Sequence, residues 1–189
     1  MGRPPTSRSG LAGFRLAAAA ALLLLAVTGA RAQAPRPSEY EVKAAFLYNF
    51  AKFVEWPAER QASATFTIAI LGEDSFGGTF DSIVGRDIRG RRLLIERLTE
   101  VPEEPVDILF ISRSEARRLE QILAALEGRP VLTVSEVEGF AHRGGVVSLV
   151  VEQKKVRFEI NVDAAARSRL EVSSKLLKLA RVVRDGEAP

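Results

Sequence analysis

Apolar side chains recur every three to four positions near residue 40, directly after a short stretch of polar residues. Ser38 followed by Glu41 forms a capping box, which is typical of the first turn of a helix. Pro57 ends the segment, because the residue before a proline avoids the helical region. The pattern predicts an amphipathic, aromatic-rich helix over residues 39–56. Its main apolar positions are Val42, Phe46, Phe50 and Phe53.

Further along the chain, short apolar runs rich in β-branched residues predict buried strands. Near the end, Val156, Phe158 and Ile160 alternate with polar residues, which indicates a half-buried strand of a hairpin. Ser112 and Glu115 form a second capping box, which predicts a helix that ends at Gly128. The other predicted strands cover residues 65–72, 91–98, 106–112 and 130–136.

A last apolar stripe is spaced like the face of a helix. Asn161 or Asp163 would cap it, and basic residues crowd its C-terminal half, where they suit the helix dipole. The stripe contains Val172, Leu176, Leu179 and Val183. We therefore expect an α/β fold with a mixed, partly parallel sheet of about five to six strands flanked by helices, including an N-terminal aromatic helix and a C-terminal amphipathic helix. A single domain over residues 39–184 and a disordered tail over 185–189 complete this prediction.

The first 32 residues have the pattern of a secretory signal peptide. Three arginines precede an apolar run over residues 16–27, and small residues follow at the spacing of a cleavage site near Ala32 or Ala34. The apolar run is shorter than the roughly 20 residues that span a bilayer. No arginine pair precedes it, so we expect export by the general secretory route, cleavage, and a periplasmic location.

Removing this segment changes the charge of the protein. Without the four arginines of residues 1–32, the 27 Lys and Arg fall to 23, against 24 Asp and Glu, which gives a net charge of −1. A surface for nucleic acid is therefore not indicated. The chain has no cysteine, which excludes thiol chemistry, and the length after cleavage is enough for a core without disulfides.

Candidate catalytic and cofactor motifs are weak. A serine triad would need the only histidine, His142, beside a nucleophile such as Ser112 or Ser148, but no G-x-S-x-G motif is present. One histidine and no cysteine leave only carboxylates as metal ligands, so we expect no metal. The glycines of LGEDSFGG lack dinucleotide-binding spacing, so we expect no cofactor.

The aromatic segment allows two interpretations that can both hold. Phe46, Phe50 and Phe53 would pack on the sheet as core. Tyr48, Trp56 and also Tyr40 would protrude from the edge of that face, since tyrosine and tryptophan are the residue types that most often anchor protein contacts. Acidic residues on the same segment argue against a membrane-surface helix.

Several blocks of the chain resemble the YfiR family of exported bacterial proteins. They are AFLYNFAKFVEWP near the start, GFAHRGG, RFEIN, and SSKLLKLA near the end. The resemblance covers roughly residues 39–183. It implies a periplasmic α/β protein, often dimeric, and it brings no catalytic motif. Well-known members carry cysteines, many with one at the position of Val106, whereas this chain has none.

The founding member of that family represses an inner-membrane diguanylate cyclase and can be sequestered by an outer-membrane lipoprotein, and relatives are fused to sensor kinases. The resemblance therefore implies a non-enzymatic regulator with a partner of this kind and a homodimeric state. We expect its contact surface near Tyr48 and Trp56, and near Arg181 and Arg184 on the outer face of the predicted last helix. The alternative is a small-ligand sensor module that feeds a sensor kinase or transporter, with polar groups such as Asn49 or Arg143 in an aromatic pocket.

Overall fold

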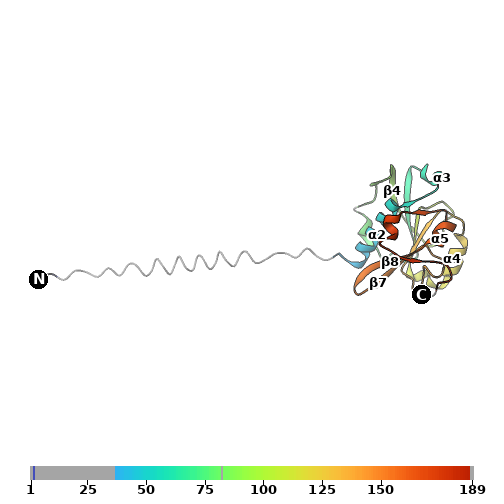
Figure 1. Ribbon diagram of the computed structural model, residues 1–189. Coiled ribbons are helices and arrows are strands. Elements are labelled where there is room, and N and C mark those ends of the chain that lie inside the picture. Colours follow the sequence, from blue (N-terminus) through green and yellow to red (C-terminus); the bar gives the residue numbers. More distant parts are fainter. Residues whose placement is uncertain (1, 3–36, 82, 188–189) are drawn as a thin grey trace. The chain divides into compact units, whose positions relative to one another are not determined.

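An eight-stranded mixed sheet organises the part of the chain that the computed structural model describes, which is residue 2, residues 37–81 and residues 83–187 (Figure 1). The predicted signal peptide, residues 1–32, lies outside the described residues except for Gly2. The strand order is β10-β8-β7-β6-β5-β2-β4-β3. The strands are β2 (Thr65–Leu71), β3 (Asp87–Ile88), β4 (Arg91–Leu98), β5 (Ile108–Ile111), β6 (Leu132–Ser135), β7 (Val147–Glu152), β8 (Lys155–Asn161) and β10 (Arg181–Val183).

The middle of this sheet is parallel and its ends are mixed. Strands β4, β2, β5, β6 and β7 run parallel to one another, whereas β7 and β8 form an antiparallel hairpin. The short strands β10 and β3 pair parallel to β8 and antiparallel to β4, respectively. The predicted α/β class with a mixed, partly parallel sheet is confirmed. The sheet is larger than predicted because the two short strands at its edges have too few residues to show a strand pattern.

Helices cover the sheet, and a small second sheet joins two connections. The helices are α2 (Glu39–Phe53), α3 (Ala58–Gln61), the 3-10 helices η2 (Gly77–Phe80) and η3 (Arg113–Arg118), α4 (Leu119–Ala125), α5 (Val162–Arg167) and α6 (Ser174–Leu177). Strand β1 (Val54–Glu55) pairs antiparallel with β9 (Glu171–Val172). The predicted capping box of α2 is present, since Ser38 and Glu41 bond reciprocally. Ser112 precedes η3, but its buried hydroxyl makes no cap hydrogen bond, so the second predicted box is wrong.

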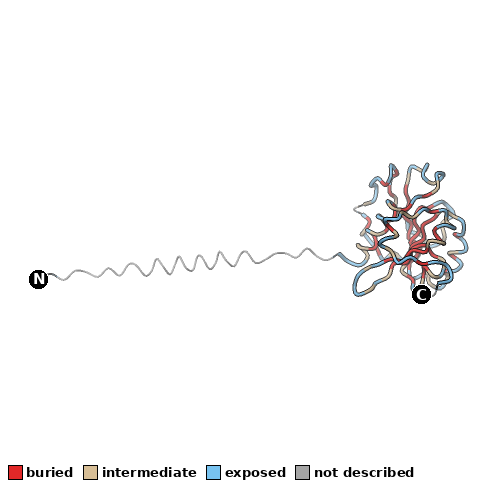
Figure 2. The backbone as a smooth tube through the Cα atoms, viewed as in Figure 1, coloured by how far each residue is buried: buried red, intermediate tan, exposed pale blue. Residues whose placement is uncertain are grey.

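The central strands are buried along their length (Figure 2) and carry apolar side chains on both sides, because helices cover each face of the sheet. In β2, Phe66, Ile68 and Ile70 join the core cluster under α2, while Ala69 and Leu71 join the cluster under α4. Alternate side chains of a strand point to opposite faces, so the continuous apolar run of the sequence is explained by burial on both faces.

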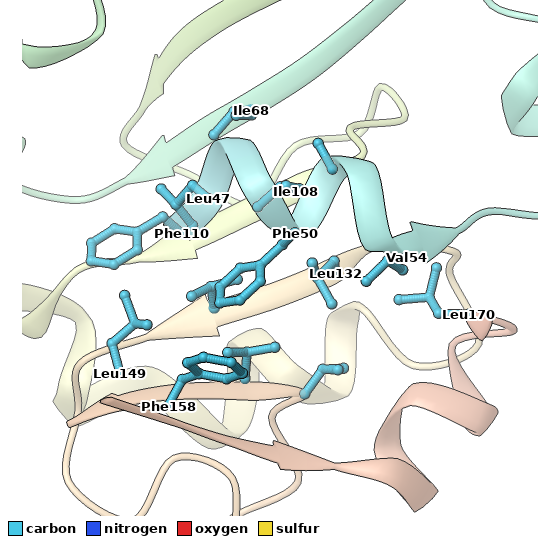
Figure 3. Close-up of a cluster of buried hydrophobic side chains, with 14 of the residues drawn as sticks. Leu47, Phe50, Val54, Ile68, Ile108, Phe110, Leu132, Leu149, Phe158 and Leu170 are labelled. Carbon is cyan, nitrogen blue, oxygen red and sulfur yellow. The ribbon is translucent and has the colours of Figure 1, made fainter. Parts of the chain in front are cut away.

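The N-terminal helix packs on the sheet through its large apolar residues. Leu47 and Phe50 are fully buried and point from α2 toward the strands that carry Ile108 and Leu132 (Figure 3). Phe46 and Phe53 are half-buried against the same cluster. The prediction that the phenylalanines of this helix form core is confirmed.

The predicted C-terminal amphipathic helix is wrong. Helix α5 ends at Arg167, and Arg169 adopts a left-handed conformation (φ 55°) that interrupts the helix. The chain then alternates between short elements, because β9 pairs with β1 and β10 pairs with β8. Leu176 of the predicted stripe is buried, whereas Leu179 is 75% exposed. Pairing with distant strands has therefore overridden the local helical spacing.

The end of the described chain is held to the domain. Asp185, which we predicted to lie in a disordered tail, accepts a hydrogen bond from the side chain of Asn161 (2.9 Å) and pairs with Arg167. Both bonds lower the pKa of the Asp185 carboxyl, and the bond from Asn161 has the larger effect. Residues 188–189 of the predicted tail lie outside the described residues. Among the described helices, none has the length and apolar character needed to cross a membrane.

Candidate functional site

Trp56, a predicted contact residue, is buried. Its side chain is 4% exposed and packs edge-on against Phe66, with ring centroids 5.1 Å apart. Its indole N–H donates to the backbone carbonyl of Asp107 (3.1 Å). The expectation that Trp56 protrudes is wrong, because the chain leaves α2 as a strand, and the indole anchors this connection to β5.

The indole lies next to a buried charge cluster that the sequence did not reveal. The carboxylate of Asp107 is fully buried and accepts hydrogen bonds from Arg91 (2.9 and 3.0 Å) and from the backbone N–H of Thr67 (2.8 Å). A second guanidinium, that of Arg60, lies 2.9 Å away. The Nε atom of Arg60 is buried without a hydrogen-bond partner, but both guanidiniums pair with Asp107, so the arrangement suits a structural clamp that joins α3, β2 and β4 to the residue before β5. Asp107 lies in an apolar run, which is the one signal that could have indicated it.

Tyr48 is half-buried on α2, so only part of its ring is available for contact. The ammonium of Lys52, one turn later, lies 4.0 Å from the centre of the ring. Asn49, considered as a ligand-binding group, is exposed on the same helix. Tyr48 is therefore compatible with a contact role at its exposed side, but it does not project freely.

Arg181 and Arg184 belong to a sheet edge and not to a helix, which corrects our expectation. Arg181 starts β10, and its guanidinium donates to Glu152 and to Glu159, both at 2.8 Å. Its hydrogen bonds to Glu152 and Glu159 raise the pKa of Arg181, and the bond to Glu152 has the larger effect. Arg184 follows the strand and lies 3.4 Å from Asp163. Both guanidiniums are more than half exposed, at 61% and 63%.

A shallow groove of about 380 Å³ lies beside Arg181. Within the described chain, the most exposed large apolar residues include Leu179 beside this groove and Val182 on β10. An exposed apolar surface with a charged border is typical of a protein contact. The main residues lining this β8 groove are Glu152, Arg157, Phe158, Leu179, Ala180 and Arg181.

The residues considered for other chemistry are not brought together. The Nδ1 atom of His142 lies 3.0 Å from the carbonyl oxygen of Glu187, and its Nε2 atom lies 4.0 Å from Glu159. The hydroxyls of Ser112 and Ser148 are buried and have no hydrogen-bond partner, so neither is bonded to His142. Across the residues that the structure describes, no group of three or more His, Cys, Asp or Glu side chains could hold a metal ion.

The alternative ligand site also lacks the expected geometry. Arg143 pairs with Glu120, and neither Arg143 nor Asn49 lines the groove or the two smaller hollows of about 200 and 80 Å³ described for this chain. The hollow of about 80 Å³ lies beside Trp56 and Arg91.

The comparison with known families agrees with the blocks seen in the sequence. A family model described as YfiR/HmsC-like matches residues 40–181. This span includes all of α2 except its first residue, strands β2 to β8 of the large sheet, and the first residue of β10. Since the match covers well over half of the chain, the protein belongs to the YfiR/HmsC-like family.

Proposed function

We propose that this protein is a non-enzymatic periplasmic regulator that binds the periplasmic part of an inner-membrane diguanylate cyclase and lowers its output of cyclic-di-GMP. The observation that carries the proposal is the family match over residues 40–181. The N-terminal sequence pattern supports export, because a basic segment and a short apolar run precede a cleavage-like site.

The surface chemistry supports contact with another macromolecule. The exposed edge formed by β8 and β10 combines partly exposed apolar side chains with arginines, and both types are common in protein interfaces. Tyr48, Arg181 and Arg184 are the contact candidates that retain an exposed part. Trp56 is not among them, because its side chain is buried.

The mechanism we propose is a shift of population. The regulator binds the inactive arrangement of the cyclase more tightly than the active one, so that its binding favours the inactive state. A competing partner, such as an outer-membrane lipoprotein, restores activity by removing the regulator. A sensor kinase is the other membrane partner that this family suggests, and a homodimer is the expected state of the free regulator.

Deletion of the gene in the native host tests this function. We expect intracellular cyclic-di-GMP and biofilm to rise, and a plasmid-borne copy with its export signal should restore both. A copy without residues 1–32 should fail to restore them, because it stays on the wrong side of the membrane. Unchanged cyclic-di-GMP after deletion would contradict the proposal.

The small-ligand sensor has weaker support. Ligand pockets usually enclose about 300–1,000 Å³ and most of the ligand surface. The aromatic hollow beside Trp56 has only about 80 Å³, and the β8 groove, at about 380 Å³, is shallow and open, so it would not enclose a ligand. A thermal-shift screen of amino acids and nucleotides tests this alternative, and a ligand that raises the melting temperature would favour it.

A further inference from the structure

Strand β8 has an edge that its neighbour covers only in part. Strand β10 pairs with residues 159–161 of β8, whereas β7 pairs with β8 on the other side along residues 155–160. Within the described part of the chain, residues 155–158 therefore have no strand on their outer side. An open strand edge presents backbone N–H and C=O groups that can pair with an added strand.

The two faces of this open segment differ in chemistry. Lys155 and Arg157 point to one face, and Val156 and Phe158 point to the other, since strand residues alternate. On the apolar face, Val151 lies opposite Val156 and is 51% exposed. The β8 groove provides room at this edge. Leu179 is exposed at the groove, whereas Phe158, which also lines it, is only 5% exposed because its ring packs against Phe46 and Phe50 of α2.

The charges at the edge leave an excess of positive potential. Arg181 already binds both carboxylates of the groove, Glu152 and Glu159, at 2.8 Å. Arg157 is 60% exposed and reaches Glu152 only at 3.7 Å. Lys155, at the start of the strand, is exposed as well. A segment that binds here would therefore gain from acidic side chains opposite Lys155 and Arg157.

We propose that residues 155–158 of β8 accept an extended segment of the partner protein as an added strand, and that this segment alternates acidic with apolar side chains. Backbone hydrogen bonds would supply affinity and the two faces would supply specificity, as in other cases of strand addition. The inference rests on the proposed function, because it names the recognition chemistry of that partner.

A second copy of the chain fits this edge poorly. Two copies paired antiparallel through residues 155–158 would bring Lys155 and Arg157 of one copy beside those of the other. Like charges opposite each other across a strand pair are destabilising. The edge therefore favours an acidic partner over self-association.

Peptide binding tests the inference without knowledge of the partner. The probe is a blocked eight-residue peptide of alternating Asp and Val, added to the ¹⁵N-labelled mature protein and followed by amide chemical shifts. We expect shifts confined to β8, β10 and the β8 groove. A peptide of alternating Lys and Val should bind weakly, and an Asp–Val peptide with alternate N-methylated amides should not bind, because it lacks the donors for strand pairing.

Charge-reversal variants test the same inference, with a matched control elsewhere on the surface. The double variant Lys155→Glu/Arg157→Glu should bind the Asp–Val peptide roughly tenfold more weakly, since about two exposed charge pairs are lost, and it should bind the Lys–Val peptide more strongly. The double variant Arg113→Glu/Arg117→Glu, on the exposed side of η3, should behave as wild type. Equal binding of all peptides, shifts elsewhere, or no shifts would overturn the inference.

The native host separates this inference from the proposed function. If deletion raises cyclic-di-GMP and the Lys155→Glu/Arg157→Glu variant still restores repression, the edge of β8 is not the contact surface. The proposed function as a regulator would then still hold. If the peptide results hold and deletion leaves cyclic-di-GMP unchanged, the strand-accepting edge remains and the cyclase assignment fails.

Discussion

Asp107 illustrates how much of this protein depends on contacts between residues that are far apart in the sequence. Its carboxylate is fully buried between Arg60 and Arg91, and its backbone carbonyl accepts from Trp56. The apolar run around it predicts a strand correctly. The arginines approach Asp107 from distant segments, so no local pattern could have identified the cluster. For the same reason, a tryptophan expected at the surface turned out to be a core residue.

We expect Asp107→Asn to destabilise the protein strongly. The amide keeps the size of the side chain but removes the charge that compensates the guanidiniums of Arg60 and Arg91, and breaking a buried ion pair from one side costs about 3–5 kcal/mol. Urea unfolding measures the loss as a lower midpoint.

The matched control for this change is Glu59→Gln. Glu59 pairs with Arg169 at 2.6 Å, but both side chains are more than half exposed, so little stability depends on the pair. A loss for Asp107→Asn no larger than that for Glu59→Gln would contradict the importance of the buried cluster.

Lys43 is a second buried charge, and its stability contribution depends on pH. It contacts Glu39 and Glu136, and its side chain is 1% exposed. Burial lowers the pKa of Lys43, but hydrogen bonds to Glu136 and Glu39 outweigh this effect and raise it above 10.5. The stabilisation is therefore fully present below pH 10.5, and it disappears as the pH rises through the higher pKa of the folded state.

Lys43→Met should cost about 3 kcal/mol near neutral pH, because it leaves the carboxylate of Glu136 buried without its cation. The difference in unfolding free energy from wild type should stay constant from neutral pH upward and shrink only above pH 10.5. Lys52→Met on the same helix is the control, since Lys52 is exposed. A difference that already shrinks between neutral pH and pH 10.5 would contradict this explanation.

At the scale of elements, the sequence predicts best what local residues determine. Helix α2 carries its own cap and its own apolar spacing, and both are found. The region after Arg167 shows equally regular spacing, yet it forms short helices and strands. Its conformation depends on pairing with β1 and β8, which are far away in the chain. The spacing alone could not show this pairing.

The turn before β7 provides a test at this scale. Gly145 donates its N–H to the carbonyl of Phe140 (3.0 Å), and a Cβ at this position would overlap the ring of Phe140. Phe140 is fully buried in the cluster under α4, so the ring has little room to move. We expect Gly145→Ala to cost about 2–3 kcal/mol through overpacking, measured as a lower melting temperature.

Gly78→Ala serves as the control for this substitution. Gly78 is exposed, and the nearest atom to its Cβ would be the flexible carboxylate of Asp81, at 3.1 Å. Its effect should stay within about 0.5 kcal/mol, as is usual for surface changes. Equal stability of the two variants would show that the Phe140 ring can adjust.

At the scale of the whole molecule, family motifs carried more information than physical patterns did. The blocks near both ends of the chain indicated the family, and the match over residues 40–181 confirms it. Charge and composition only argued against certain classes of protein, such as nucleic-acid-binding proteins. The open edge of β8 could not be predicted, because it depends on where the short strand β10 begins.

Complementation of a deletion strain tests the central claim most directly, with intracellular cyclic-di-GMP as the measured quantity. The wild-type gene and His142→Ala should both restore repression, because contact and not catalysis is required. The Lys155→Glu/Arg157→Glu variant should be exported and folded but should leave cyclic-di-GMP high. Loss of repression by His142→Ala in a folded protein, or no rise of cyclic-di-GMP in the deletion strain, would contradict regulation by contact.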